Sequence, residues 1–196
     1  MAGTVLGKHV IDVVGQVLVH SEAEPAAIAR ERAALDAIDP EAEQPWEAFA
    51  TTLARVAKTV RDPMLVEVGR RIVREAKLEF ERWGFDTAEK MLADWDAPFG
   101  ALIIDAPEEQ TVLTLKYQPG QAFLRAGAVL PGALIEGYIR GVLAMFGADL
   151  TELIRHRVRM DGRPYHLFEV RWREAPIPRM IGRQHTARMS FGLRVA

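Results

Sequence analysis

Two histidines, His156 and His166, are the residues whose types and spacing come nearest to a metal site. Both fall in segments that alternate apolar and polar residues, as strands do, and Glu152 precedes them on the same predicted face. Two histidines and one carboxylate can bind a transition metal. Their spacing matches no established ligand motif, however, and histidines beside an aromatic residue such as Phe168 are more often bonded to backbone or water. We therefore expect no metal here.

The segments 153–160 and 165–172 form a predicted β-hairpin, and the loop between them decides which residues meet. A two-residue turn would pair the apolar positions of one strand with the arginines of the other. A three-residue loop at Asp161–Arg163 keeps the apolar faces matched and places Val158 opposite His166. In that register the two histidines are diagonal neighbours, about 7–8 Å apart at the backbone.

The same register places Arg155, Arg157, Arg159 and Arg171 on the outward face of the hairpin. They could form a surface for an anionic partner or ligand. A charged strand face is more often simply solvated, here balanced by Glu169, and we favour that interpretation.

A helix at 131–146 is predicted to precede the hairpin. Pro131 suits the first helical position, and Gly147 suits a left-handed C-terminal cap. Between them, one apolar face recurs at helical spacing. Gly137 and Gly141 lie four residues apart on this helix, and they would let another backbone approach closely.

The remaining pattern predicts an α+β fold, with N-terminal helices followed by an antiparallel sheet into which the long helix is inserted. The first helix is apolar over much of its circumference, so it is either buried or at a subunit interface. Asp86 is the expected cap of a short helix. The expected helices are 4–19, 26–38, 45–60, 62–83 and 86–95, and the expected further strands are 111–117, 122–126 and 187–195.

Aromatic residues of the sheet and the long helix could line an apolar cavity between the two, although such residues more often form plain core. The candidate pocket residues are Tyr117, Phe123, Tyr138, Val142, His156, His166 and Phe168.

No reaction is identified by the sequence. Neither Ser21 nor Ser190 sits in the strand-to-helix turn of a serine nucleophile, and no glycine-rich phosphate loop occurs. With no cysteine, the chain has no disulfide, thiol nucleophile or thiolate metal site. A net charge of −2 argues against nucleic acid as the main partner.

The run VRMDGRPYHLFEV at 158–170 resembles the C-terminal signature of the 4-vinyl reductase domain, with a tight turn followed by an aromatic-rich strand. That domain is related to the haem nitric-oxide-binding domains and to the TRAPP vesicle-tethering subunits. The strand around Tyr117 and the helix 132–147 look similar too. The resemblance implies one ligand-binding domain of this type over residues 1–196, and a dimer.

The sequence departs from the family at its metal ligands. The two family cysteines fall on Val158 and His166, and the acidic residue before them falls on Arg155. The haem-binding relatives hold iron by a histidine on a mid-chain helix, and no histidine lies between His20 and His156. The resemblance therefore implies neither the family zinc site nor a haem held in that way, and we expect no cofactor.

By analogy with these relatives, we expect a non-enzymatic sensor or scaffold domain that binds an apolar small molecule or a protein partner, as a homodimer. One alternative is a tetrapyrrole-related enzyme or accessory factor. Another is a pure interaction module with a filled core. No export leader or membrane-spanning segment is apparent, so we expect a cytoplasmic protein.

Overall fold

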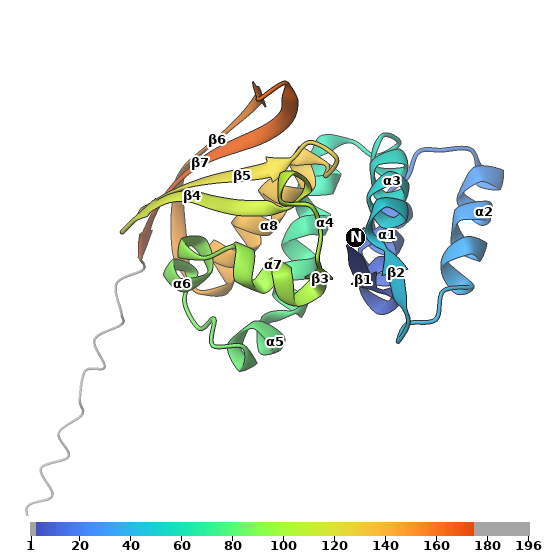
Figure 1. Ribbon diagram of the computed structural model, residues 1–196, viewed down its shortest axis with the longest axis horizontal. Helices are drawn as coiled ribbons and strands as arrows, with labels where there is room; N and C mark the ends of the chain where they lie inside the picture. Colours follow the sequence, from blue (N-terminus) through green and yellow to red (C-terminus); the bar gives the residue numbers. More distant parts are fainter. Residues whose placement is uncertain (1–2, 175–196) are drawn as a thin grey trace, which may run out of the picture.

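The computed structural model describes residues 3–174 of the 196-residue chain. Its helices and antiparallel sheets confirm the predicted α+β class. The larger sheet has four strands. Figure 1 shows a helical N-terminal part at one end of the molecule and this sheet at the other, with α4 and α8 between them. The last expected strand, 187–195, lies outside the described residues.

The N-terminal part pairs helices with a small sheet. Its elements are β1 (Thr4–Leu6), α1 (Gly7–Val19), α2 (Pro25–Asp36), β2 (Glu43–Pro45) and α3 (Trp46–Ala57). The predicted helix 4–19 is wrong at its start, because residues 4–6 pair as a strand with β2 and with β3 (Ile103–Ile104). The apolar face of α1 is buried within this chain, at Val10, Val13, Val14 and Val17. This favours a buried helix over a helix at a subunit interface.

The middle of the chain is one helix of 14 residues followed by several short ones. They are α4 (Asp62–Glu75), α5 (Lys77–Arg82), α6 (Ala88–Ala93), α7 (Asp96–Leu102) and the 3₁₀ turn η1 (Glu108–Gln110). The predicted helix 62–83 is interrupted at Ala76, whose ψ of 3° leaves the α-helical range. The predicted cap of α6 is also wrong: Thr87 accepts the Lys90 N–H at 3.1 Å, while Asp86 pairs with the Lys90 ammonium.

The C-terminal sheet has the order β4-β5-β7-β6, with all neighbours antiparallel. Its elements are β4 (Val112–Gln118), β5 (Gln121–Gly127), β6 (Ala148–Met160) and β7 (Arg163–Glu174), and α8 (Gly132–Met145) connects β5 to β6. Leu124, Phe168 and Val170 of the sheet are fully buried together with Leu134 and Ile139 of α8. Gly147 adopts a φ of 71° after α8, which confirms the predicted left-handed cap.

The predicted hairpin exists, but its predicted register is wrong. Asp161 and Gly162, both with positive φ (51° and 77°), make a two-residue turn of the kind that suits the twist of paired strands. Arg157 therefore lies opposite His166, and Arg155 lies opposite Phe168. Because one residue of slip exchanges the faces of a strand, His156 is on the other side of the sheet from His166.

The two-residue turn alone would place arginines of β6 on the core face along its whole length. A β-bulge in β6 shifts the register so that leucines face the core further along. Leu150 pairs with Trp172 but Glu152 pairs with Arg171, so one extra residue, Thr151, shifts the register of β6. Leu150 and Leu153 then face the core at the base of the hairpin. Beyond them the same face carries Arg155, which reaches Asp62 at 2.9 Å at the start of α4. The arginine is thus not buried among apolar groups.

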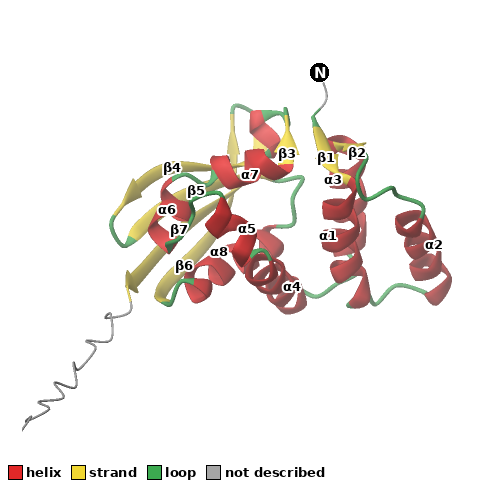
Figure 2. Cartoon of the chain, turned by 90° about the horizontal axis from the view of Figure 1, so that it is seen from below, coloured by secondary structure: helices red, strands yellow, loops and turns green. Residues whose placement is uncertain are grey.

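The α4 and α8 helices cross in backbone contact, and Figure 2 shows them side by side. A Cβ added at Gly69 would lie 2.3 Å from the Leu134 carbonyl oxygen, and one added at Gly137 would lie 2.2 Å from the Val66 oxygen. A Cβ at Gly141 would also be close, 3.1 Å from the Arg70 backbone. These distances confirm the close approach predicted from the spacing of Gly137 and Gly141.

Replacing Gly137 with alanine is expected to lower the free energy of unfolding by about 2–3 kcal/mol, because backbone atoms of α4 cannot yield as a side chain can. Chemical denaturation measures the change. Gly15→Ala in α1 is the control, because its added Cβ meets nothing within 4 Å. It should be neutral or stabilising by up to about 1 kcal/mol. Equal effects of the two variants would contradict the role of the crossing.

Candidate functional site

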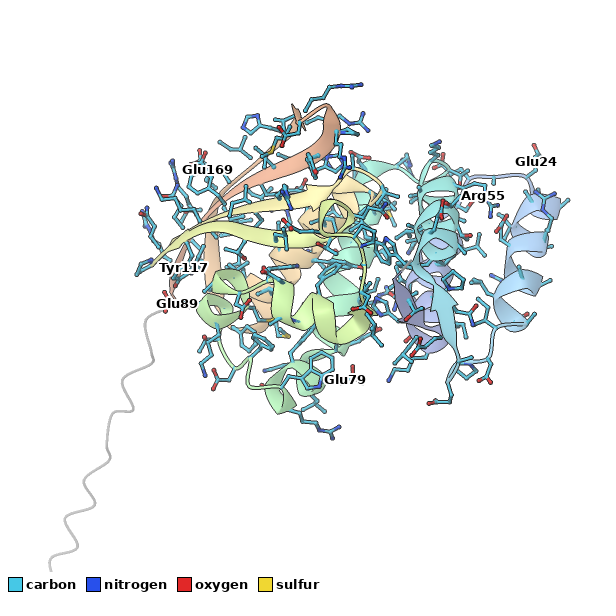
Figure 3. The ribbon with its side chains drawn as sticks, in the orientation of Figure 1. Glu24, Arg55, Glu79, Glu89, Tyr117 and Glu169 are labelled. Atoms are coloured by element: carbon cyan, nitrogen blue, oxygen red, sulfur yellow. The ribbon has the colours of Figure 1, made fainter. Side chains whose placement is uncertain are left out.

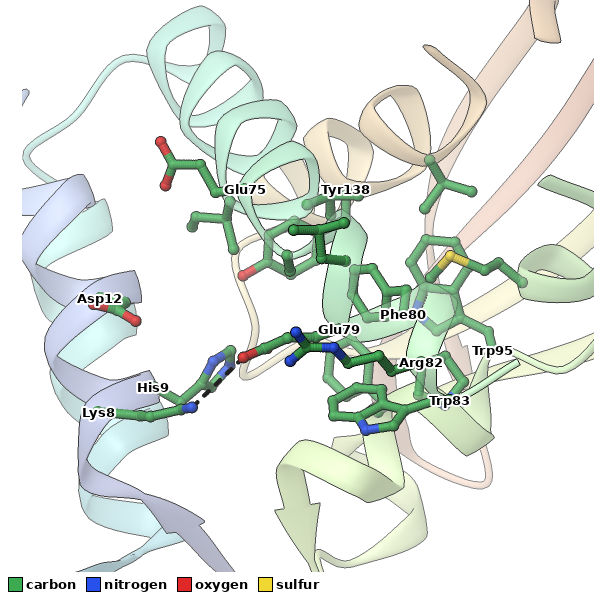
Figure 4. Close-up of a pocket in the computed structure, with 18 of the residues that line it drawn as sticks. Lys8, His9, Asp12, Glu75, Glu79, Phe80, Arg82, Trp83, Trp95 and Tyr138 are labelled. Atoms are coloured by element: carbon green, nitrogen blue, oxygen red, sulfur yellow. Dashed lines mark ion pairs between the residues drawn. The ribbon is translucent and has the colours of Figure 1, made fainter. Parts of the chain in front are cut away.

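A cavity of about 500 Å³ lies between α1, the α4–α5 junction, the α6–α7 segment and α8 (Figure 4). Its lining combines an apolar body with a polar rim, which is typical of small-molecule sites. The lining residues are Lys8, His9, Asp12, Gln16, Ile72, Val73, Glu75, Ala76, Leu78, Glu79, Phe80, Arg82, Trp83, Met91, Trp95, Pro98, Phe99, Tyr138 and Val142.

Two buried aromatic residues bring polar groups to the apolar part of this cavity. The indole N–H of Trp95 is fully buried and has no hydrogen-bond partner within residues 3–174. Tyr138, a buried residue of α8, adds its hydroxyl to the same lining. Burial raises the pKa of Tyr138, so its hydroxyl stays protonated. Trp95 is fixed at its backbone, where its N–H donates to the Thr114 hydroxyl of β4 at 3.1 Å. A buried donor without a partner costs stability, so the Trp95 N–H favours a ligand that can accept a hydrogen bond.

The polar rim connects α1 to α4 and α5. The Lys8 ammonium lies 3.6 Å from the Glu79 carboxylate, and the Gln16 amide donates to Glu75 at 3.0 Å. Figure 4 shows the first pair beside the cavity. Both contacts are exposed to solvent, so each stabilises the packing of α1 against α4 and α5 only weakly.

His9 is a neutral imidazole beside the cavity. Burial lowers its pKa to about 4, and its ring packs against Phe49 with a centroid distance of 6.1 Å. One turn further along α1, burial raises the pKa of Asp12. At neutral pH His9 therefore offers both a hydrogen-bond donor and an acceptor without adding charge.

The predicted pocket residues are divided among several places. Tyr138 and Val142 line this cavity together, and His166 lines a second cavity at the other end of α8. Phe168 is buried in the core beneath the sheet. The structure does not bring these residues into one pocket between α8 and the sheet, because apolar side chains fill that interface.

The other predicted pocket residues lie away from the cavity. Tyr117 donates from its hydroxyl to Glu89 at 2.9 Å and packs on Trp172 (Figure 3). Phe123 neighbours the buried Leu124 in β5, so it points to the opposite face of the sheet. His156 is exposed on that outer face.

The metal site considered for the two histidines does not form, because the β6 register places His156 and His166 on opposite faces. Within residues 3–174, no group of three or more histidine, cysteine, aspartate or glutamate side chains could hold a metal ion.

The cavity also fails to match the haem ligation of the relatives. The mid-chain helices α4 to α7, residues 62–102, contain no histidine, cysteine or tyrosine, the side chains that hold haem iron in globins, P450 enzymes and catalases. His9 lines the cavity from α1, which is not a mid-chain helix. The residues present therefore do not fit a haem bound through a mid-chain histidine.

Sequence reasoning did not assign His9, Trp95 or Glu79 to a site. A signal was present in α1, where Lys8, His9, Asp12 and Gln16 form a polar stripe at helical spacing on an otherwise apolar helix. What faces that stripe depends on how distant helices pack, which local patterns do not reveal.

No protein-family model matches the sequence, and no curated protein matches it. Its fold, however, is similar to that of H-NOX domains. A Cs H-NOX mutant with 4-cyano-L-phenylalanine at site 5 superposes with a TM-score of 0.58 at 13% identity, over 90% of this chain and 98% of that one. The unliganded Fe(II) H-NOX protein from K. algicida gives 0.51 at 12% identity, over 84% and 88%. At such identities the likeness shows the fold alone.

The lowered pKa of His9 predicts a specific loss of stability in acid. The unfolded chain binds a proton at this residue near pH 6.5, whereas the folded chain binds it only near pH 4. Lowering the pH between these values should therefore decrease the free energy of unfolding, by at most about 3 kcal/mol from this residue.

Denaturation at several pH values would measure this effect. His9→Gln should remove that part of the pH dependence, whereas His20→Gln, at the far end of α1, should keep it. A His9 resonance that titrates near pH 6.5 in NMR would contradict the prediction.

Proposed function

We propose that this protein is a non-enzymatic sensor domain that binds an apolar small molecule in the cavity between α1 and α8. The observation that carries the proposal is the cavity itself: about 500 Å³, with aromatic walls and a buried indole N–H, on Trp95, that lacks a partner within residues 3–174. This volume lies within the range of small-molecule pockets.

The lining defines the chemistry of the ligand. Phe80, Phe99 and Trp95 offer flat surfaces to a ring system or a short hydrocarbon body. A hydrogen-bonding group on the ligand would meet the Tyr138 hydroxyl or the Trp95 N–H. At the rim, Lys8 pairs with Glu79 and Glu75 accepts from Gln16, so these charged groups are already engaged and a neutral ligand fits better than an ionic one.

The polar groups of the cavity support binding more than catalysis. The Glu79 and Glu75 carboxylates are engaged in contacts that connect helices, and the neutral His9 packs against Phe49 rather than beside a hydroxyl or thiol nucleophile. We therefore retain a non-enzymatic role, which remains a prediction.

Several parts of the expectation remain predictions. They are the homodimer, the cytoplasmic location, and the resemblance to 4-vinyl reductase and TRAPP subunits. Within residues 3–174, every helix is too short or too polar to cross a bilayer. The alternative of a pure interaction module is favoured only if the cavity stays empty in solution.

Native mass spectrometry of the purified protein, compared with its denatured mass, tests occupancy directly, and the same spectrum reports a dimer. A neutral apolar dye, Nile red, then tests the location. Ala76→Phe would fill the cavity from the α4–α5 junction, so dye affinity should fall at least about tenfold.

Ala29→Phe, the same change on the exposed face of α2, is the matched control and should leave dye binding unchanged. Equal dye binding by the wild type and the Ala76→Phe variant would place the dye elsewhere and contradict the proposed site. A native mass without excess, together with no dye binding, would favour the interaction module.

A further inference from the structure

A second cavity, of about 430 Å³, lies at the N-terminus of α8. Its walls come from the end of α3, the start of α4, the loop before α8, and strands β6 and β7. The lining residues are Ala54, Ala57, Lys58, Asp62, Leu65, Ala128, Val129, Leu130, Pro131, Gly132, Ala133, Arg155, Arg157 and His166. This set is separate from the lining of the first cavity.

The N-terminus of α8 is buried and uncapped. Pro131 provides no side-chain cap, and the first turn closes through Leu134 and Ile135, which donate to the Pro131 carbonyl. The N–H groups of Gly132 and Ala133 have no acceptor in the described part of the chain, and both residues are buried. A helix of 14 residues presents a partial positive charge at this end.

Cationic side chains surround this helix end. Lys58 and Arg157 have no carboxylate partner among residues 3–174. Arg155 is engaged, at 2.9 Å from Asp62 and 3.9 Å from Glu136. Among residues 3–174, Asp62 is the one carboxylate that lines the cavity, and Arg155 offsets its charge. Two cations therefore remain available to a ligand.

His166 gives a second and independent indication of a ligand. It is nine-tenths buried, and its imidazole packs so closely on the helix end that a Cβ at Gly132 would lie 2.8 Å from its Nδ1. One nitrogen bonds to the Leu130 backbone, and the other has no partner in the described residues. The imidazole is thus largely buried beside an uncapped helix end, it lines the cavity, and its second nitrogen is open to a ligand there.

The charges around His166 indicate the sign of that ligand. Burial, followed by the positive charges of Arg157 and Arg155, lowers its pKa, and Asp62 opposes this shift weakly. A bound anion would offset the two arginines and favour the protonated ring, whose free nitrogen then becomes a donor.

We propose that this cavity binds the phosphate group of a small phosphorylated molecule. A phosphate dianion has oxygens in several directions, which match two backbone N–H groups from below and Lys58 and Arg157 from the sides. A carboxylate would leave part of this donor set without a partner. The site lies outside the apolar cavity, so the proposal stands or fails independently of the proposed sensor function.

Titration of the full-length protein with inorganic phosphate, followed by amide NMR, tests the site. The Gly132 and Ala133 signals should shift and saturate, and acetate at equal ionic strength should not reproduce this. Arg157→Gln and Lys58→Gln should each weaken phosphate binding at least about tenfold, the loss expected for one charge-assisted hydrogen bond.

Arg159→Gln is the matched control, because it removes the same charge from the same face of β6 outside the cavity lining. It should change phosphate binding less than about twofold, since exposed charges are screened by salt. The proposal is overturned if the two amides do not saturate, if acetate acts equally well, or if Arg159→Gln weakens binding as much as Arg157→Gln.

Discussion

The backbone contact between α4 and α8 is the constraint on which the rest of the structure depends. Gly69 and Gly137 face each other where the helices cross, and neither leaves room for a Cβ atom. The two backbones therefore lie closer than they could with side chains between them. This crossing fixes α8 between the sheet and the helical part of the molecule (Figure 1). Both sides of α8 are therefore covered, and ten of its 14 residues are buried.

The position of α8 explains why both cavities contain its residues. Its N-terminal turn ends at the polar cavity, while Tyr138 and Val142 face the apolar one. Six residues of helix, a rise of about 9 Å, separate Gly132 from Tyr138. The same helix thus lines two cavities of different chemistry, and the surrounding elements determine that chemistry. Aromatic residues between α5 and α7 line one cavity, and Lys58 after α3 and the arginines of β6 line the other.

Local sequence signals identified α8, its glycine cap, the close approach at Gly137 and the presence of the hairpin. These features depend on residues near one another in the chain. The hairpin register could not be predicted in the same way, because the bulge at Thr151 shifts it by one residue without any residue that marks it. The break at Ala76 and the apolar cavity depend on packing between distant helices, so they were also missed.

The two walls of the apolar cavity are held by interactions of very different strength. The wall formed by α8 is fixed by backbone packing against α4. The rim on α1 meets α4 and α5 through the Lys8–Glu79 pair and the Gln16–Glu75 hydrogen bond, both exposed and each stabilising by about 1 kcal/mol or less. A ligand that displaces these contacts therefore loses little, whereas one that displaces α8 would disrupt the core. The apolar cavity therefore has one fixed wall and one weakly held rim.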